Sequence, residues 1–423
     1  MAAAAPRVHR LANGVSVICE PMAGLESFAL SVVAGRGARL EPAERSGWSH
    51  LLEHMVFKGA GGRSARDIVE AIERTGGQIN AATGYERTSF QVRALKGGLE
   101  LGLRTCADLI LHPALDGAEL EREKQVVGQE IAESEDTPDD HVFELAQAAA
   151  FGGQPLGRPI LGQVLTVDAA QPDSLGAWRE GIYAPDRLVI SASGAVGEDE
   201  LLALAEDAFG PAAGPVLPIP EPARFEGGLR PERRRLEQAH LVFLLAGPGA
   251  RHTHYYTARV FAEILGGGMS SRLFQEAREK RGLAYSIDAW AESYADIGMF
   301  GVYAGAAAEN AAPLAEVVAA EIKGLADQVS DDELQRAKAQ LKARLLMARE
   351  SPLVRAEQAA GQMLLFGRLF SAQEIADGVE AVSAADVRAL GEELLASGAC
   401  VGAALGSARA MSAPERFQRS LFN

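Results

Sequence analysis

The chain has 423 residues, of which 48% are hydrophobic and 6% aromatic, and a formal net charge of −16 at pH 7. The length predicts more than one domain, and the acidic charge argues against nucleic acid as a partner. There is no stretch of about 20 apolar residues that would span a membrane and no apolar secretory signal near the N-terminus, so we expect a cytoplasmic protein without a membrane partner. Its three cysteines are odd in number and widely spaced, which excludes a disulfide framework.

The first elements alternate between strand and helix. The apolar run at residues 28–34 predicts a buried strand, and the helix predicted after it contains His50-Leu-Leu-Glu53-His54. A second helix is expected over 64–75, with Ser64 as its N-cap. After Gly76-Gly77, strands are expected over 78–82 and 88–94.

The motif around His50 predicts a metal site with a general base beside it. On a helix, His50, Glu53 and His54 fall within about 100° of one face, and the two leucines between them point toward a core. Two imidazoles one turn apart can bind the same Zn²⁺, and the adjacent carboxylate can deprotonate a water. This order of residues, with Glu next to the second His, is that of the inverzincins. A chance coincidence of residues or a structural zinc site is the alternative.

The strand over 78–82 has two interpretations that the residues leave equally open. It is either an ordinary member of a sheet or an edge strand, and an exposed edge accepts an extended peptide by main-chain pairing.

An acidic helix is expected over 116–135 and offers a third metal ligand, because catalytic zinc usually takes three protein ligands. Glu123 and Glu130 are seven positions apart and share a face, and Val126 and Val127 between them should pack that face inward. The residues narrow the ligand to this helix without choosing among its carboxylates, Glu119, Glu123, Glu130 and Glu133. The alternative is a solvated acidic helix, and this is the favoured interpretation for the acidic residues near its end, Glu133, Glu135, Asp136, Asp139 and Asp140.

A segment at 210–228 contains five prolines and predicts an extended linker. The second half repeats the order of the first half, with a strand at 240–246, helices at 255–265 and 270–280, strands at 284–290 and 299–304, and a long helix at 331–349. It lacks the His50 motif.

We therefore expect an α+β fold of two duplicated α/β-sandwich halves, each with a mostly antiparallel sheet and helices packed on one face. The domains are placed at 1–212 for metal binding and 229–423 for the homologous half, with a linker at 213–228.

Together these pieces resemble the M16 zinc peptidase family, which includes the mitochondrial processing peptidase, pitrilysin and insulin-degrading enzyme. The resemblance covers nearly the whole chain, and the length matches the shorter members, in which two subunits form a chamber. The matching stretches are Leu11-Ala-Asn-Gly-Val-Ser-Val17, the His50 motif, residues 76–83, Glu123-Lys-Gln-Val-Val-Gly-Gln-Glu130, Pro155-Leu-Gly-Arg-Pro-Ile-Leu-Gly162 and Ser271-Arg-Leu-Phe-Gln-Glu-Ala-Arg-Glu-Lys-Arg-Gly-Leu-Ala-Tyr285.

The resemblance implies a zinc metalloendopeptidase that acts on extended or unfolded peptides as a homodimer. Its Zn²⁺ would be bound by His50, His54 and Glu130, with Glu53 as the general base. Glu123 would orient the ligands or tune the water, while Arg278 and Tyr285 would hold the substrate and stabilise the oxyanion.

Acidic residues outnumber basic ones between Asp116 and Glu144, which favours peptides with Arg or Lys near the scissile bond. The alternatives are a non-catalytic assembly subunit of the same fold and the metal half of a heterodimeric peptidase.

Overall fold

The computed structural model describes residues 6–423, and the chain divides into two compact units. Unit 1 contains the chain up to Ala132, together with Pro159–Pro220 and Leu346–Ser371. Unit 2 contains Glu133–Arg158, Glu221–Leu345 and Ala372–Asn423. The step from Pro220 to Glu221 falls within the proline-rich segment, which has no regular secondary structure. Among residues 6–423, we find no helix with the length and hydrophobicity that a membrane span requires.

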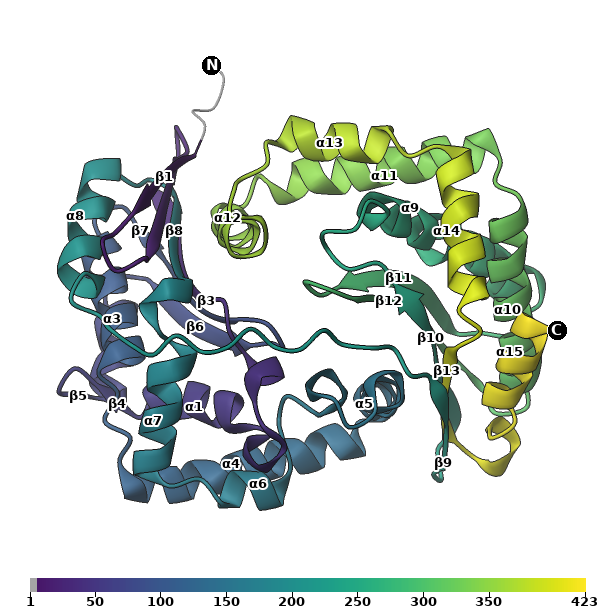
Figure 1. Ribbon diagram of the computed structural model, residues 1–423, viewed down its shortest axis with the longest axis horizontal. Coiled ribbons are helices and arrows are strands. Elements are labelled where there is room, and N and C mark those ends of the chain that lie inside the picture. Colours follow the sequence, from purple (N-terminus) through teal and green to yellow (C-terminus); the bar gives the residue numbers. More distant parts are fainter. Residues whose placement is uncertain (1–5) are drawn as a thin grey trace. The chain divides into compact units, whose positions relative to one another are not determined.

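Unit 1 contains a six-stranded sheet (Figure 1). Neighbouring strands are antiparallel except for one parallel pair, β2 with β8. The strand β6 lies at one edge, which resolves the question that the sequence left open for this segment. The order across the sheet is β1 (Arg7–Arg10), β2 (Ser16–Pro21), β8 (Leu188–Gly194), β3 (Ser27–Ala34), β7 (Thr88–Leu95) and β6 (Gln78–Thr83).

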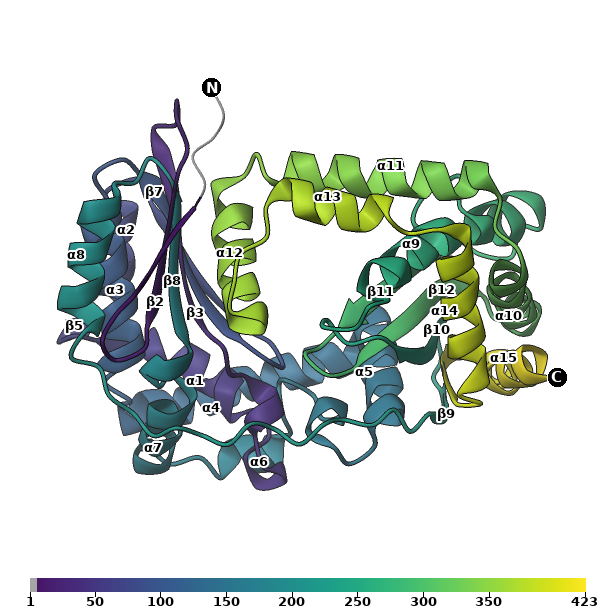
Figure 2. The same ribbon diagram turned by 45° about the horizontal axis from the view of Figure 1, so that its top comes forward.

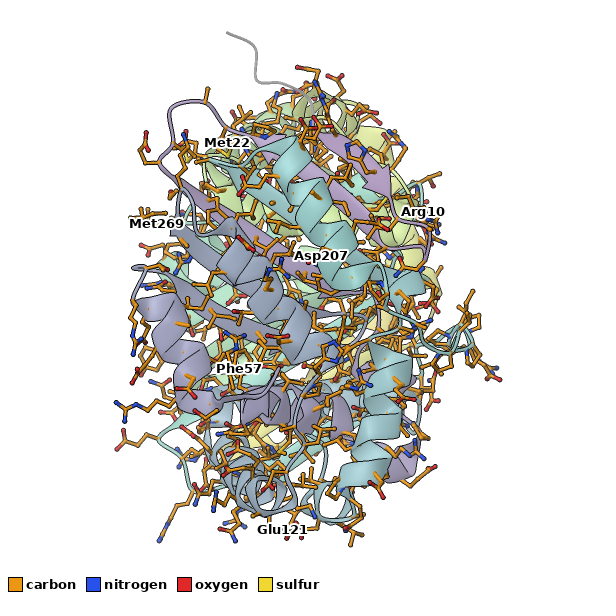
Figure 3. All side chains as sticks on the ribbon, turned by 90° about the vertical axis from the view of Figure 1, so that its left-hand side faces the viewer. Arg10, Met22, Phe57, Glu121, Asp207 and Met269 are labelled. Carbon is orange, nitrogen blue, oxygen red and sulfur yellow. The ribbon has the colours of Figure 1, made fainter. Side chains whose placement is uncertain are left out.

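Helices from the first half of the chain cover one face of this sheet and enclose the main core of unit 1. Figure 3 views the molecule from this side, with Asp207 on α8 and Phe57 directly after α1. The helices that contribute to the core are α1 (Trp48–Val56), α2 (Ala65–Glu73), α3 (Leu99–Leu111), α4 (Gly117–Asp136), α6 (Val164–Asp168), α7 (Pro172–Ile182) and α8 (Glu198–Phe209).

Unit 2 repeats this architecture with a five-stranded sheet. Its order matches that of the unit 1 sheet without β1, and the parallel pair, here β9 with β13, recurs at the same place. The order is β11 (Ser286–Ser293), β12 (Gly298–Ala307), β10 (Gln238–Gly247), β13 (Cys400–Gly406) and β9 (Gly228–Arg233). The helices packed on its core are α9 (Tyr255–Gly266), α10 (Ala311–Asp327), α11 (Asp331–Ala348), α13 (Ala372–Glu380), α14 (Ala384–Ala396) and α15 (Ala413–Phe422).

The two halves of the chain exchange one helix each. The helix α12 (Pro352–Phe366) follows the linker in sequence, yet it packs on the β2, β3 and β8 face of unit 1 (Figure 2). The helix α5 (Pro138–Phe151) precedes the linker and packs on β9, β10 and β13 of unit 2. The units are therefore not contiguous stretches of chain. The division into residues 1–212 and 229–423 stays a prediction of which two stretches of sequence arose by duplication.

The exchange also changes the expected layering. The predicted class, α+β with two mostly antiparallel sheets, is confirmed. The expectation of helices on one face only is incomplete, because Ala359 and Ala360 of α12 pack against Ile18, Val33 and Val189 on the second face of the unit 1 sheet. The buried carboxylate of Glu20 anchors this packing by accepting hydrogen bonds from Arg349 and Arg355.

Most predicted elements of the second half are confirmed within a few residues, but the segment before Tyr285 differs in detail. The helix predicted over 270–280 has π-type hydrogen bonding in η5 (Phe274–Lys280). It ends at Lys280 and is followed by Gly282, whose φ of +61° suits glycine. Leu283 N–H donates to Ala277 and Gly282 N–H to Arg278, which closes the end of the helix. Tyr285 precedes β11 rather than belonging to it.

Arg272, in the stretch that leads to Tyr285, joins η5 to the start of α11. Its guanidinium donates to both oxygens of Glu333, from Nε at 2.7 Å and from Nη2 at 2.9 Å. The hydrogen bond from Arg272 is the main reason that the pKa of Glu333 falls from 4.5 to about 2. Two parallel charged hydrogen bonds of this kind are stronger and more directional than neutral ones.

We predict that Arg272→Met lowers the stability of the full-length protein by about 2 kcal/mol near neutral pH. Since the pKa of Glu333 is depressed in the folded state, this stabilisation is fully present above pH 4.5 and is lost as the pH falls toward 2. The difference between the urea midpoints of wild type and variant should therefore be smaller at about pH 3.5 than at about pH 7.

A matched control is Arg336→Met, which removes an exposed pair with Asp332 on the same helix and should change the midpoint little at either pH. A pH-independent loss in Arg272→Met would contradict the assignment.

Candidate active site

The helix α1 is fixed at its N-terminus by a side chain from the preceding loop. The buried carboxylate of Glu41 accepts the N–H of Gly47 at 2.8 Å and that of Ser49 at 2.6 Å. It thereby satisfies two of the donors that a helix leaves free at this end. Trp178 adds a hydrogen bond from Nε1 to the hydroxyl of Ser49, at 3.2 Å.

A close approach of two glycines also holds this helix start. Gly47 and Gly162 both have positive φ, at +92° and +78°. A Cβ on Gly47 would lie 2.5 Å from the carbonyl oxygen of Leu161, and one on Gly162 would lie 2.3 Å from that of Ser46. No other residue fits either position without moving the backbone. This contact gives a structural reason for the glycine that ends the 155–162 motif.

The apolar side of α1 then determines where the metal-binding motif points. Leu51, Leu52, Met55 and Val56 are fully buried in the core of unit 1. His50, Glu53 and His54 occupy the other side, as the helical period predicted.

The structure brings His50, His54 and Glu130 together. Their Nε2 and Oε2 atoms form the closest contacts, 3.6 Å from His50 to Glu130 and 3.5 Å from His54 to Glu130. One ligand atom from each residue lies within 4.8 Å of the other two. Burial, with a smaller effect of His54, lowers the pKa of His50 to about 4, so its imidazole is neutral near pH 7. Two imidazoles and one carboxylate fit the usual three-ligand set of catalytic zinc.

Glu53 lies beside this group and is held by Thr83, the last residue of β6. The Thr83 hydroxyl donates to Oε2 of Glu53 at 2.5 Å. Burial raises the pKa of Glu53, and the hydrogen bond from Thr83 opposes that shift. The backbone of Thr83 also hydrogen-bonds this carboxylate, so Thr83 fixes its orientation beside the three candidate ligands.

Glu123 has a different position from Glu130, although both lie on α4. Its side chain is 5% exposed, and Oε2 is 3.1 Å from Nδ1 of His54. Its other oxygen, Oε1, is 2.7 Å from Nζ of Lys58. The buried face of α4 consists of Leu120, Glu123, Lys124 and Val127. Val126, which we expected to face inward, is 38% exposed, because it lies about 100° from its buried neighbour around the helix.

A cavity of about 690 Å³ in unit 1 opens beside these residues. Glu53, His54 and Glu123 line it together with β6, the edge strand. Its apolar wall includes Phe57 and Ile72, and α12 contributes Leu353. An extended chain lying along β6 would therefore pass the candidate general base.

Arg278 and Tyr285 belong to unit 2. The guanidinium of Arg278 lies over the ring of Phe274 at 4.7 Å. The backbone N–H of Tyr285 donates to Gly305 at 2.8 Å, and its side chain is 61% exposed. Their roles toward a substrate stay predictions.

Sequence reasoning missed Glu41, Lys58 and Thr83 as supporting residues. Thr83 ended a stretch that we matched to the family, but nothing in the stretch indicated a contact with Glu53. Glu41 lies nine residues before the motif, a separation that no local rule connects to it. Lys58 lies one helical turn after His54, so its spacing was a usable signal, but its contact with Glu123 depends on α4.

Two family models match the chain. Residues 16–164 match the model for Insulinase (Peptidase family M16), and residues 169–341 match that for the Peptidase M16 inactive domain. A Bacillus subtilis protein called "Uncharacterized zinc protease YmxG" is 37% identical over 385 residues, which cover 90% of this chain and 94% of that protein. A Rickettsia felis "Uncharacterized zinc protease" is 34% identical over 381 residues, 90% of this chain and 92% of its own. The chain therefore belongs to peptidase family M16.

Solved structures show the same fold at lower identity. A protease from Helicobacter pylori superposes with a TM-score of 0.89 at 20% identity, covering 96% of this chain and 100% of that chain. A Pseudomonas fluorescens structure described as a peptidase M16 inactive domain gives 0.87 at 20% identity, covering 95% and 98%. A chain from the structure of complex III2 of Candida albicans gives 0.86 at 22% identity, covering 98% and 99%.

Proposed function

We propose that this protein is a zinc-dependent endopeptidase that cleaves extended peptides. The observation that carries the proposal is the convergence of His50, His54 and Glu130 with Glu53 beside them, at a cavity bordered by an edge strand. The names of its relatives as zinc proteases support the same activity.

His50, His54 and Glu130 would hold the zinc ion. When bound, zinc supplies Lewis acidity, which polarises a carbonyl and lowers the pKa of water. Glu53 accepts the proton of the attacking water and passes it to the leaving amide nitrogen. Thr83 would hold the Glu53 carboxylate in place for this proton transfer, because its hydroxyl donates to Oε2.

The edge strand supports the choice of extended peptides. The outer side of β6 has no neighbouring strand in the sheet of unit 1, so its main-chain groups can pair with a substrate backbone. A folded protein has few free backbone groups to offer, so unfolded segments are the preferred substrates.

A non-catalytic assembly role is the alternative, because the same fold occurs in a structure of complex III2. The complete set of ligands and general base argues against it, since an assembly role requires none of these residues.

Replacing the base and replacing a ligand should have different effects. Glu53→Gln should retain near-stoichiometric zinc and lose hydrolysis of a random peptide pool by orders of magnitude, because Glu53 is not a ligand. His50→Ala, His54→Ala and Glu130→Gln should lose both. Metal analysis after gel filtration, combined with the peptide assay, checks these outcomes. Loss of zinc from a folded Glu53→Gln protein would contradict the roles assigned here, and zinc binding without any hydrolysis in the wild type would favour the assembly role.

We propose further that the peptides carry Arg or Lys near the scissile bond. The acidic segment at 116–144 is one reason for this preference. The cavity is another, because three carboxylates, those of Glu53, Glu73 and Glu123, line it with only two cations, Lys58 and Arg93. Lys58 is paired with Glu123, which leaves Glu73 on α2 as an exposed carboxylate of this wall.

We predict that Glu73→Gln raises KM for lysine- and arginine-containing peptides about threefold and leaves their kcat unchanged, since one partly screened ion pair is lost. Acidic peptides should not be affected in this way. Glu70→Gln is the matched control, because Glu70 lies on the same helix but pairs with Arg66 and Arg74. Equal changes for basic and acidic peptides would refute a charge-based preference.

We also propose a homodimer in which Arg278 and Tyr285 act on substrate at the metal centre of the other subunit. The metal ligands lie in unit 1, whereas Arg278 and Tyr285 lie in unit 2. The chain length, matching the shorter members of the family, supports pairing of two copies.

Mixing two inactive variants tests this arrangement. In an exchanged mixture of Glu53→Gln with Arg278→Ala/Tyr285→Phe, about half of the dimers contain both chains, and each of these has one intact site. About a quarter of wild-type activity should return. If mixed dimers form, as shown by co-purification of two affinity tags, and remain inactive, the arrangement in trans is wrong while the zinc assignment stands.

A further inference from the structure

We propose that Lys58 is a positioning residue of the metal centre. It holds the carboxylate of Glu123 in the orientation in which that carboxylate accepts a hydrogen bond from His54. The inference rests on the proposed zinc site, and it assigns a role to a residue that is neither a ligand nor the general base.

The contacts form a chain of three residues. Nζ of Lys58 is 2.7 Å from Oε1 of Glu123, and Oε2 of the same carboxylate is 3.1 Å from Nδ1 of His54. The other ring nitrogen of His54, Nε2, is the one that lies 3.5 Å from Glu130. Lys58 is therefore connected to a ligand atom through a single carboxylate and a single imidazole.

Burial explains why Glu123 depends on Lys58. The side chain of Glu123 is only 5% exposed, so water compensates little of its charge. A buried carboxylate is retained at low cost only when it is paired and hydrogen-bonded. Each oxygen of Glu123 has one such partner, so a rotation of the carboxylate would break both contacts.

The position of Lys58 in the chain limits its freedom. It is the second residue after α1, and its backbone N–H donates to the carbonyl of Met55 at 3.1 Å, which continues the last turn of the helix. The same turn therefore presents both His54 and the cation that fixes its acceptor. Through Glu123, Lys58 sets the orientation of the His54 ring, because an acceptor at Nδ1 determines which nitrogen faces the metal.

A neighbouring lysine provides a natural comparison. Lys124 is adjacent to Glu123 in sequence and its side chain is 6% exposed, but its Nζ pairs with Glu121 at 2.7 Å. It lies on the same helix as Glu123 and makes an ion pair of the same length as the Lys58 pair, but with Glu121 rather than with the carboxylate that contacts His54. Replacing Lys124 should perturb α4 without perturbing the metal centre.

Lys58 also lines the cavity, so a direct contact with substrate is the rival explanation. Such a contact would change KM and leave zinc affinity unchanged. Zinc affinity, measured without any substrate, therefore separates the two roles.

The test measures the zinc dissociation constant of the full-length protein by competition with a chromophoric chelator. Lys58→Met should weaken zinc binding roughly tenfold, the lower end of the range for partners of metal ligands. Lys58→Arg, which keeps the cation, should recover most of the affinity. Lys124→Met should bind zinc like the wild type. Circular dichroism and thermal unfolding of each variant establish that the fold is retained.

A double-mutant cycle decides whether Lys58 acts through Glu123. If it does, Lys58→Met/Glu123→Gln should have the same zinc affinity as Glu123→Gln alone, because the second substitution has nothing left to disrupt. If each substitution weakened zinc binding by its own factor and the two factors multiplied in the double variant, the inference would be wrong. Wild-type zinc affinity in Lys58→Met would also overturn it. A wild-type protein that binds no zinc would instead refute the proposed function itself, so the two failures are distinguishable.

Discussion

The apolar side of α1, formed by Leu51, Leu52, Met55 and Val56, is packed into the core of unit 1, and this burial decides where the opposite side of the helix points. A rotation of the helix that moved His50 or Glu53 would expose leucine side chains, at about 2 kcal/mol for each fully buried one. Glu41 and the Gly47–Gly162 contact fix the helix along its axis. The rest of the site is built on that fixed surface.

Three glutamate carboxylates lie around α1, and each contacts a different set of atoms. Glu130 faces Nε2 of both histidines, Glu123 faces Nδ1 of His54, and Glu53 receives the Thr83 hydroxyl. Three carboxylates in a small volume repel one another, so each must have its own compensating donor or cation. In the proposed mechanism, this separation would let Glu130 bind metal, Glu123 orient a ligand and Glu53 transfer a proton.

The sequence was sufficient for features whose cause is local. The helical period placed His50, Glu53 and His54 on one face, and Ser64 is the N-cap of α2 as predicted. The choice of Glu130 over Glu123 came from the family resemblance, because both share a helix face and only tertiary packing separates them. The contacts of Glu41, Lys58 and Thr83 could not be predicted, because each joins segments that are brought together only by the tertiary fold. No helix was predicted over α5 or α12. An amphipathic pattern there could not have said which sheet each helix covers, because it identifies an apolar face without identifying the surface that this face packs on.

The exchange of α5 and α12 has a consequence for how the chain folds during synthesis. The sheet of unit 1 has all its strands once Gly194 has emerged, yet Ile18, Val33 and Val189 stay uncovered until α12 follows. Chains are made from the N-terminus, and exposed apolar surface in a nascent domain favours aggregation. Ser31, Ser191 and Ser193 lie on the same face of β3 and β8 as Val33 and Val189. Their small hydroxyl side chains expose less apolar surface before α12 is made than leucine or isoleucine would. A nascent unit 1 with these serines is expected to aggregate less before α12 is made than one with an entirely aliphatic face.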